Sequence, residues 1–410
     1  MASFDAAAAE FAGKALGTFW TLFFAASVAA DLDLLPGVSA RLRLFAARGK
    51  QADAEPSSPS APADPRAASK WWVPHAWFAH FYVVGIACNA FVLAHALAVE
   101  PISAEHAAAT LASCLFQAHV ARRFLETAFV ARHREGARMH LAGYLVGVFY
   151  YVAAPVTLAT PETKRAVCET VRVALAKALA EATRASPASG GDETPTLFAS
   201  ARALRRFALS PRFAPSSIGA SAFVRSSLGT ARSVSSALAG APVSVSRVAR
   251  VAAGAAAFAL GSAKQARCHR LLARLRETPR ATETRAKATR AEDRSGTRLS
   301  SGTKLQSNQS NTSISQIRDV GRRLHTNKTH YAVPRGDWFE VVSSPHYLAE
   351  CVLYAGLALV AGARAFPRLA PMLAAVGANL ALAARRTHAW YLETFPEYPK
   401  NRWAMVPGLL

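Results

Sequence analysis

Charged side chains enter an otherwise apolar stretch of this sequence at Arg122, Arg123 and Glu126. Arg123 and Glu126 are three residues apart, so a helix would place them on one face. One interpretation is a helix end at which the arginines snorkel to a membrane surface. The other is a cationic wall for a cofactor phosphate, with Glu126 holding an arginine in place. The residues alone leave both interpretations open.

Histidine and tyrosine side chains are candidates for proton donation. His80 and Tyr82 lie in an aromatic stretch, and His119 and His140 lie on other apolar segments near the same predicted membrane face. A lone histidine of this kind is more often an interfacial residue with its hydrogen bonds satisfied than a catalyst. Convergence of several such groups favours a site only modestly.

Glu350 falls one turn into an apolar segment near the carboxyl end. An unpaired carboxylate in such a segment is costly, so Glu350 needs a donor. The donor could be a cofactor amide, a ribose hydroxyl or a structural arginine. The same argument applies to Asn379, His388, Gln265 and His269, which also interrupt or end apolar segments.

Several familiar sites are absent from the sequence. It contains no Gly-x-Gly-x-x-Gly after a strand, no Walker loop, no His-Glu-x-x-His, no Gly-x-Ser-x-Gly and no metal-spaced cluster. We therefore predict no metal site and no soluble nucleotide-binding fold. Any dinucleotide would have to bind inside a helix bundle.

The elements that must position these side chains are apolar segments long enough to span a membrane, which takes about 20 residues. Seven segments qualify, and the Ala-rich fifth is the weakest. We therefore predict an all-α integral membrane protein with about seven transmembrane helices and long, partly disordered basic loop inserts. The segments are 14–35, 76–98, 107–131, 139–160, 246–266, 346–364 and 368–391.

Two inserts divide the chain into five regions. The first insert is low in complexity, with a possible helix near 163–184, and the second is rich in Arg, Thr, Ser and Asn and is predicted to be disordered. The regions are 1–160 with four helices, the insert 161–245, the fifth helix and cofactor segment 246–276, the insert 277–325, and the C-terminal region 326–410.

Composition supports a membrane protein. The 410 residues are 51% hydrophobic, yet the formal net charge is +22. Basic connecting loops between membrane helices reconcile these values. The basic residues accompany no nucleic-acid recognition signature, so we expect no nucleic-acid partner. Five irregularly spaced cysteines predict neither a disulfide framework nor a zinc site. Loop charge predicts a lumenal N-terminus and a cytosolic C-terminus.

Three blocks of residues resemble the membrane steroid 5-alpha-reductase family, and most closely its polyprenol (polyprenal) reductase branch. The first joins Arg122–Glu126 to Arg138–Tyr151, and the second is Gln265–His269. The third begins with Gly-Asp-Trp-Phe-Glu at 336–340, continues with Ser-Ser-Pro at 343–345 and reaches Glu350.

The resemblance implies an endoplasmic reticulum enzyme that binds NADPH from the cytosolic side, an oxidoreductase acting on a CH–CH group. The residues that it places at or around the cofactor, together with Arg123, are Gln265, His269, Arg276, Tyr331, Asp337, Trp338, His346, Glu350, Asn379, His388, Tyr391 and Arg402. The steroid branch polarises its enone with a Glu and a Tyr that have no clear counterpart in this sequence. We expect the catalytic donor to be His80, Tyr82 or His119.

Hydride addition to a C=C bond needs an acceptor for the developing charge, and an α,β-unsaturated aldehyde provides one in its carbonyl oxygen. The expected substrate is therefore a long-chain isoprenoid enal that enters from the bilayer, on the route to dolichol and protein N-glycosylation. Alternatives are a 3-oxo-steroid or enoyl reductase. An alternative of another class is a non-catalytic seven-helix receptor or scaffold whose basic inserts bind acidic lipids. No obligate protein partner is predicted.

Overall fold

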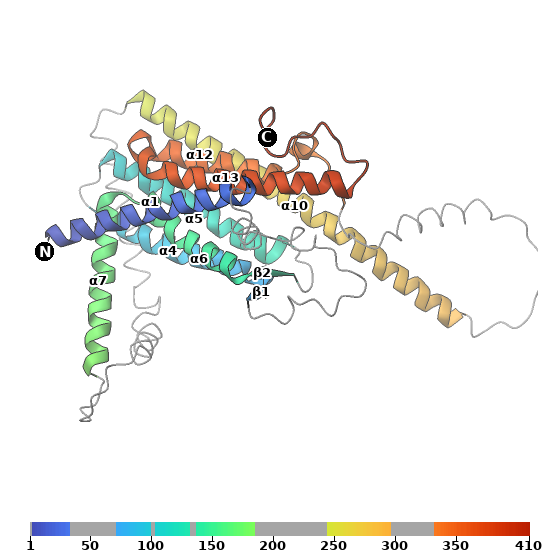
Figure 1. Cartoon of the computed structure of the whole chain (residues 1–410), viewed down its shortest axis with the longest axis horizontal. Coiled ribbons are helices and arrows are strands. Elements are labelled where there is room, and N and C mark those ends of the chain that lie inside the picture. The colour runs from blue at the N-terminus through green and yellow to red at the C-terminus, as the bar shows by residue number, and fades with distance from the viewer. Residues whose placement is uncertain (1, 33–70, 100–102, 132–136, 185–243, 297–331) are drawn as a thin grey trace, which may run out of the picture.

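The computed structural model describes residues 2–32, 71–99, 103–131, 137–184, 244–296 and 332–410. Seven helices run along the long axis of the molecule, and one, α7 (Pro161–Arg184), runs across it (Figure 1). The seven are α1 (Ala2–Leu32), α4 (Phe78–Ala98), α5 (Ala104–Leu125), α6 (Leu141–Leu158), α10 (Val245–Gly296), α12 (Pro345–Ala361) and α13 (Phe366–Thr394).

The mostly helical architecture agrees with the sequence prediction, but the count of seven membrane spans is not confirmed. In the described part of the chain, four stretches are long and apolar enough to cross a membrane: Glu10–Ala29, His75–Ala98, Leu141–Leu158 and Ala363–Thr394. The helix α12 is apolar but has only 17 residues. The helices α5 and α10 carry charged residues, so they pack in the bundle without having the composition of a lipid-exposed span.

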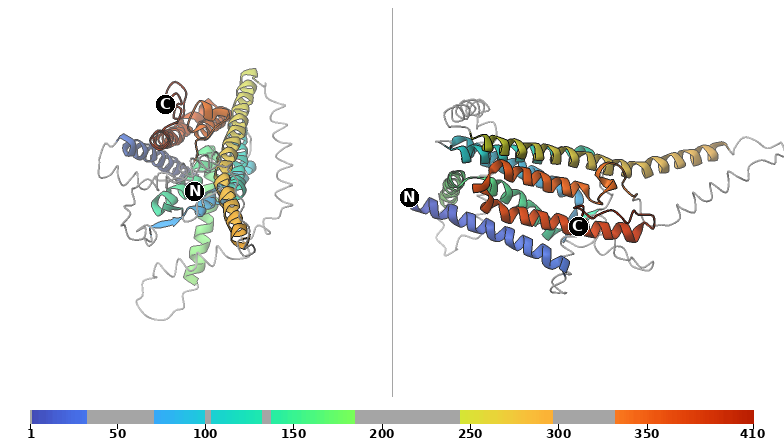
Figure 2. Two further views of the ribbon diagram at one scale, coloured as in Figure 1. Left: turned by 90° about the vertical axis from the view of Figure 1, so that its right-hand side faces the viewer. Right: turned by 90° about the horizontal axis from the view of Figure 1, so that it is seen from above.

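The prediction of disorder is wrong for residues 277–296, because α10 continues as one helix of 52 residues to Gly296. Its second half projects beyond the bundle in two views (Figures 1 and 2). This stretch lacks an apolar face, but it contains many Ala, Arg and Glu residues, which favour helix intrinsically. Residues 297–325 of that insert and 185–243 of the first lie outside the described residues. The possible helix near 163–184 corresponds to α7.

A two-stranded sheet, absent from the all-α prediction, joins the beginnings of α4 and α6. Strand β1 (Trp72–Pro74) pairs antiparallel with β2 (Arg138–His140), and Trp72 lies opposite His140. Short helices complete the described chain: η2 (His75–Trp77), the π-helix η3 (Glu126–Val130), η5 (Asp337–Glu340) and η6 (Ala363–Ala365).

The helices α10 and α12 pack at very short range because glycines remove side chains from their interface. A Cβ atom on Gly261 would lie 2.6 Å from the carbonyl oxygen of Ala349, and one on Gly356 would lie 2.6 Å from that of Gly254. Close approach through small residues is a common way for membrane helices to associate. It brings Gln265, one turn beyond Gly261, against Glu350.

Candidate functional site

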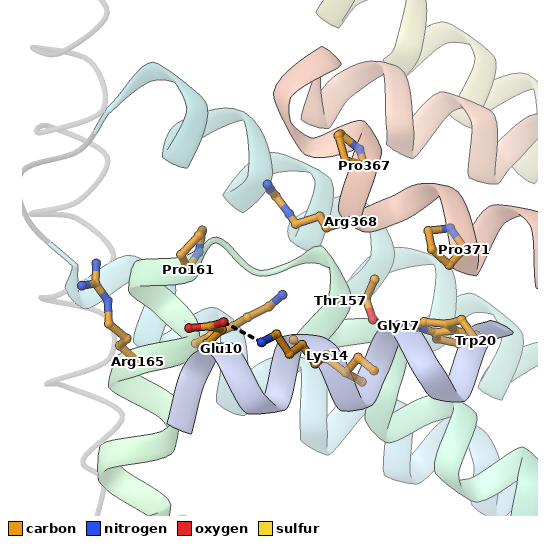
Figure 3. A pocket seen from close by; sticks show the side chains of 13 residues that line it. Glu10, Lys14, Gly17, Trp20, Thr157, Pro161, Arg165, Pro367, Arg368 and Pro371 are labelled. Carbon is orange, nitrogen blue, oxygen red and sulfur yellow. Dashed lines mark hydrogen bonds and ion pairs between the residues drawn. The ribbon is translucent and has the colours of Figure 1, made fainter. Parts of the chain in front are cut away.

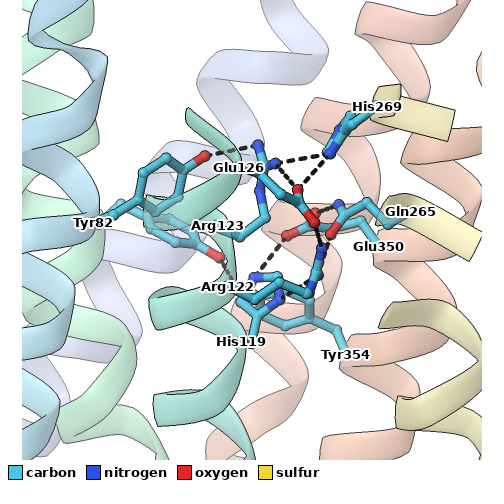
Figure 4. A network of polar contacts seen from close by, with 10 residues as sticks. Tyr82, His119, Arg122, Arg123, Glu126, Gln265, His269, Glu350 and Tyr354 are labelled. Atoms are coloured by element: carbon cyan, nitrogen blue, oxygen red, sulfur yellow. Dashed lines mark hydrogen bonds and ion pairs between the residues drawn. The ribbon is translucent and has the colours of Figure 1, made fainter. Parts of the chain in front are cut away.

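Eight polar side chains from five helical elements meet inside the bundle and form what we call the polar network (Figure 4). The helices α4, α5, α10 and α12 and the π-helix η3 contribute them. The members are Tyr82, His119, Arg122, Arg123, Glu126, Gln265, His269 and Glu350. The network therefore joins the early helices to the carboxyl-terminal half of the chain.

Glu126 is the centre of the network. Its side chain is only 9% exposed and accepts hydrogen bonds from Arg122 Nη1 and from Arg123 Nη1, the latter at 2.7 Å. His269 Nδ1 lies 2.7 Å from Glu126 Oε2, so the same carboxylate binds α5 to α10. Glu126 begins the π-helical segment η3, and π-helical turns occur frequently at functional sites.

Glu350 is the second carboxylate of the network. It accepts a hydrogen bond from Gln265 Nε2, and His119 Nε2 lies 3.4 Å from its Oε1. Arg122 Nη2 lies 3.2 Å from His119 Nδ1. Because a guanidinium only donates, Nδ1 carries the lone pair and Nε2 carries the ring proton. This Nε2 makes no hydrogen bond to the described residues.

The charges of the network balance, since Arg122 and Arg123 face Glu126 and Glu350. Buried charges are tolerated when they are paired and hydrogen-bonded. Both arginines point into the bundle toward Glu126 (Figure 4). The structure therefore supports the inward-facing interpretation of these arginines and not snorkelling to a surface.

The candidate proton donors do not all reach the network. Tyr82 is buried, and its Oη accepts a hydrogen bond of 2.8 Å from Arg123 Nη2. His119 is buried beside Glu350. His80 is exposed and lies apart, with Nδ1 3.1 Å from Tyr144 Oη. His140 caps the first turn of α6 by accepting from the backbone N–H of Ala142, which is a structural role.

Asp337 connects the C-terminal region to α10. Its side chain is 7% exposed and lies 2.7 Å from Lys264 Nζ and 3.0 Å from Arg267 Nε. The hydrogen bond from Lys264 lowers the pKa of the Asp337 carboxyl. Lys264 also lies 5.1 Å from the ring centre of Trp338, a cation–π distance. Lys264 thus contacts both Asp337 and Trp338, two residues that the resemblance places around the cofactor.

Replacing Asp337 with Asn should lower the free energy of unfolding by about 1.5–3 kcal/mol at neutral pH, because hydrogen bonds to charged groups are lost. Asp337 has a φ of 53°, and asparagine tolerates this left-handed conformation. The folded pKa is lowered, so the stabilisation is complete above the unfolded pKa of about 3.9 and disappears as pH falls through the folded pKa. Melting curves of both proteins should therefore converge under acid conditions. A constant difference across pH would contradict an ionic origin.

Residues near the carboxyl terminus form a second polar cluster, apart from the network. Ser343 Oγ lies 2.6 Å from His388 Nδ1 and accepts a hydrogen bond of 2.7 Å from Tyr398 Oη, whose ring stacks on Tyr391. Buried Arg402 donates to the carbonyl oxygen of Pro334 at 2.9 Å and to Glu340 at 3.0 Å. These contacts fix the C-terminal segment against α13.

The remaining predicted residues differ in their distance from the polar network. The ring of His346 lies 5.8 Å from that of His269, at the edge of the network. Asn379 is half-buried on α13, apart from the network's contacts. Tyr331 and the side chain of Arg276 lie outside the described residues.

Lys264 was not predicted, and Arg122 and Glu126 were predicted only as one of two open interpretations of their segment. Their signal is present in the sequence. His119, Arg122, Arg123 and Glu126 follow a spacing of three, four and seven, which defines one helical face. Their partners on α10 lie 143 residues away, as for Arg122 and Gln265, and local spacing cannot identify them.

The fold and the site define a helical membrane protein with a charge-balanced network inside its bundle. Residues 308–410 match the model of the 3-oxo-5-alpha-steroid 4-dehydrogenase family. The C-terminal part of the chain is therefore similar to the steroid 5-alpha-reductase family, and the predicted resemblance is confirmed.

Similarity to individual proteins extends over most of the chain. Polyprenal reductase 1 of Oryza sativa subsp. indica is 27% identical over 406 residues, covering 89% of this chain and 87% of that protein. Polyprenal reductase 1 of Arabidopsis thaliana is 28% identical over 355 residues, covering 82% of each. Polyprenal reductase of Homo sapiens is 40% identical over 92 residues, covering 22% of this chain and 27% of that protein.

Proposed function

We propose that this protein is an oxidoreductase of the endoplasmic reticulum membrane that uses NADPH to reduce the α-isoprene double bond of polyprenal. The product would enter the dolichol pathway, which supports protein N-glycosylation, and the C-terminus would be cytosolic. The observation that carries the proposal is the polar network, which unites the early helices with the family-matched C-terminal region. Similarity to polyprenal reductases over more than four fifths of the chain supports the substrate class.

The described residues offer suitable partners for a dinucleotide. The Glu350 side chain is 17% exposed and can accept hydrogen bonds from a carboxamide or a ribose hydroxyl. Lys264 and Arg267, the latter 63% exposed, provide cations for phosphate groups beside Trp338. NADPH, when bound, supplies the hydride that adds to the β-carbon of the enal.

Tyr82 is the donor that the geometry favours for the carbonyl oxygen of the enal. Its hydroxyl accepts from Arg123 and also contacts the Tyr151 side chain. A phenol that accepts hydrogen bonds can still donate its own proton to another oxygen. The neighbouring guanidinium also stabilises negative charge on the phenol oxygen. A donor aimed at the oxygen that becomes an enolate lowers the barrier to hydride addition. His119 Nε2 lies 3.4 Å from Glu350 Oε1, so we assign His119 to positioning that carboxylate.

Replacing Tyr82 with Phe should lower kcat about 10²- to 10³-fold, the usual effect of removing one such donor. The KM for NADPH should change little. Tyr144→Phe is the matched control, because that hydroxyl contacts His80 and lies outside the network. A large loss in His80→Gln with normal kcat in Tyr82→Phe would instead identify His80 as the donor.

The substrate proposal is tested with the purified full-length chain in detergent, NADPH and either a polyprenal or the matching polyprenol. Saturation of the α-isoprene unit is followed by mass spectrometry. We expect product from the aldehyde alone. Reduction of a 3-oxo-steroid without reduction of polyprenal would move the chain to the steroid substrate class. Absence of thermal stabilisation by NADPH, together with absence of turnover, would favour a non-catalytic scaffold.

A further inference from the structure

A pocket of about 630 Å³ lies at the end of the bundle where α6 passes into α7, and we call it the terminal pocket (Figure 3). The helices α1, α6, α7 and α13 contribute its wall. It is remote from the polar network: Glu105, beside the terminal pocket, and Arg122, in the network, are the two ends of α5. At 1.5 Å per residue they are about 25 Å apart.

The terminal pocket has more positive charge than its carboxylates neutralise. Its lining includes Lys14, Lys164, Arg165 and Arg368 but a single acidic residue, Glu10. Glu10 is already paired with Lys14 at 2.8 Å (Figure 3). Arg165 lies 3.6 Å from Glu162, and Arg368 Nη1 lies 3.5 Å from Glu105. Lys164 and the remaining donors of Arg368 are therefore the candidates to bind an external anion.

Lys164 is buried without a counter-ion. It is 8% exposed, and the described residues contain no carboxylate within ion-pair distance of its Nζ. Burial, reinforced by the nearby charge of Arg368, lowers the pKa of Lys164 to about 8. An ammonium in such a partly apolar pocket is stabilised when an anion binds beside it.

Arg368 also has unused donors. Its Nη1 lies 3.5 Å from Glu105, but Nε and Nη2 are buried without a hydrogen-bond partner in the described part of the chain. Two adjacent N–H groups of a guanidinium match two oxygens of a phosphate. The terminal pocket thus combines a largely buried lysine with two unpartnered N–H groups of a guanidinium.

The position of the terminal pocket corresponds to the surface of a membrane. The span Leu141–Leu158 ends three residues before α7 begins, and the span Ala363–Thr394 begins beside it. The helix α7 runs across the bundle and exposes Val171 and Leu175, which are one turn apart (Figure 1). Such a helix suits the headgroup region of a bilayer.

We propose that the terminal pocket binds the phosphate group of an anionic membrane phospholipid. Lys164 and Arg368 bind the phosphate, while the apolar wall at Leu16 and Trp20 contacts the first methylenes of an acyl chain. The ligand is negatively charged because the pocket presents Lys164 and the unpartnered donors of Arg368, and it is amphiphilic because the wall beside these groups is apolar. This site is independent of the proposed reductase function.

The test uses the full-length protein, stripped of lipid in maltoside detergent, and compares Lys164→Met with wild type. Melting temperature and native mass spectrometry are recorded with dioleoyl phosphatidic acid, with dioleoyl phosphatidylcholine and with inorganic phosphate. We expect wild type to bind and be stabilised by phosphatidic acid alone. Lys164→Met should be at least as stable as wild type without lipid and should bind phosphatidic acid about tenfold more weakly, as expected for one lost charged hydrogen bond.

Three further variants make the result specific. Arg368→Gln should reduce the response to phosphatidic acid in the same way, whereas Lys164→Arg keeps the charge and should preserve it. Arg172→Gln removes an exposed cation of α7 that is paired with Glu169 outside the pocket, and it should bind like wild type. Equal binding of phosphatidylcholine, equal stabilisation by inorganic phosphate, or undiminished binding by Lys164→Met and Arg368→Gln would each overturn the proposal.

Discussion

Replacing Glu126 with Gln should lower the free energy of unfolding by about 3–5 kcal/mol, the usual effect of breaking a buried ion pair. Glu126 accepts from Arg122 and Arg123 through its two oxygens. An amide has one acceptor oxygen, so its NH₂ group must face one of the two guanidinium groups. The variant therefore leaves a buried positive charge unpaired, and reductase activity should fall with it because Tyr82 loses the alignment that Arg123 provides.

The matched control for Glu126→Gln is Glu169→Gln on α7. Glu169 also pairs with an arginine three residues away, at 2.7 Å, but both side chains are 41% exposed. Exposed pairs contribute about 0–1 kcal/mol, so this control should melt close to wild type. Adding Arg123→Met to Glu126→Gln should recover part of the lost stability, which a double-mutant cycle measures. Equal melting temperatures for the two single variants would show that the network does not stabilise the fold.

Sequence patterns predicted the apolar helices well and the extent of α10 poorly. Apolar length alone located α4, α6 and α13 to within a few residues, because a lipid-exposed span needs about 20 apolar residues. The same criterion misjudged α10, whose second half has helix-forming residues but no apolar face. A search for apolar segments does not detect a helix that forms by intrinsic propensity and has no buried apolar face.

The sequence predicted which types of residue form the site, but it did not predict which of them are hydrogen-bonded to each other. The cost of an unpaired carboxylate correctly required a donor for Glu350, but the sequence could not identify it as Gln265, 85 residues away. The same holds for Glu126 and His269, which are 143 residues apart. His80 was grouped with Tyr82 because they are neighbours in sequence, yet residues two apart on a helix do not share a face, and only Tyr82 points into the bundle.

The close packing of α10 on α12 makes Gly261 the backbone position on which the network depends. A methyl group there would lie 2.6 Å from the carbonyl oxygen of Ala349 and 2.8 Å from the amide nitrogen of Leu353. Both are backbone atoms of a helix, so the strain is relieved only if the helices separate. We expect Gly261→Ala to lower the free energy of unfolding by about 1–3 kcal/mol, as overpacking does.

Gly377→Ala is the control, and we expect it to change the free energy of unfolding in the opposite direction. Gly377 lies inside α13, where an added Cβ meets no atom within 4 Å, so alanine should raise the free energy of unfolding by about 0.5–1 kcal/mol through helix propensity. Separation of α10 from α12 also withdraws Gln265 from Glu350, so Gly261→Ala should lose turnover while Gly377→Ala retains it. Thermal melting and kcat measured on both variants test the two effects together. If Gly261→Ala were as stable and active as Gly377→Ala, the close contact would not be what positions the network.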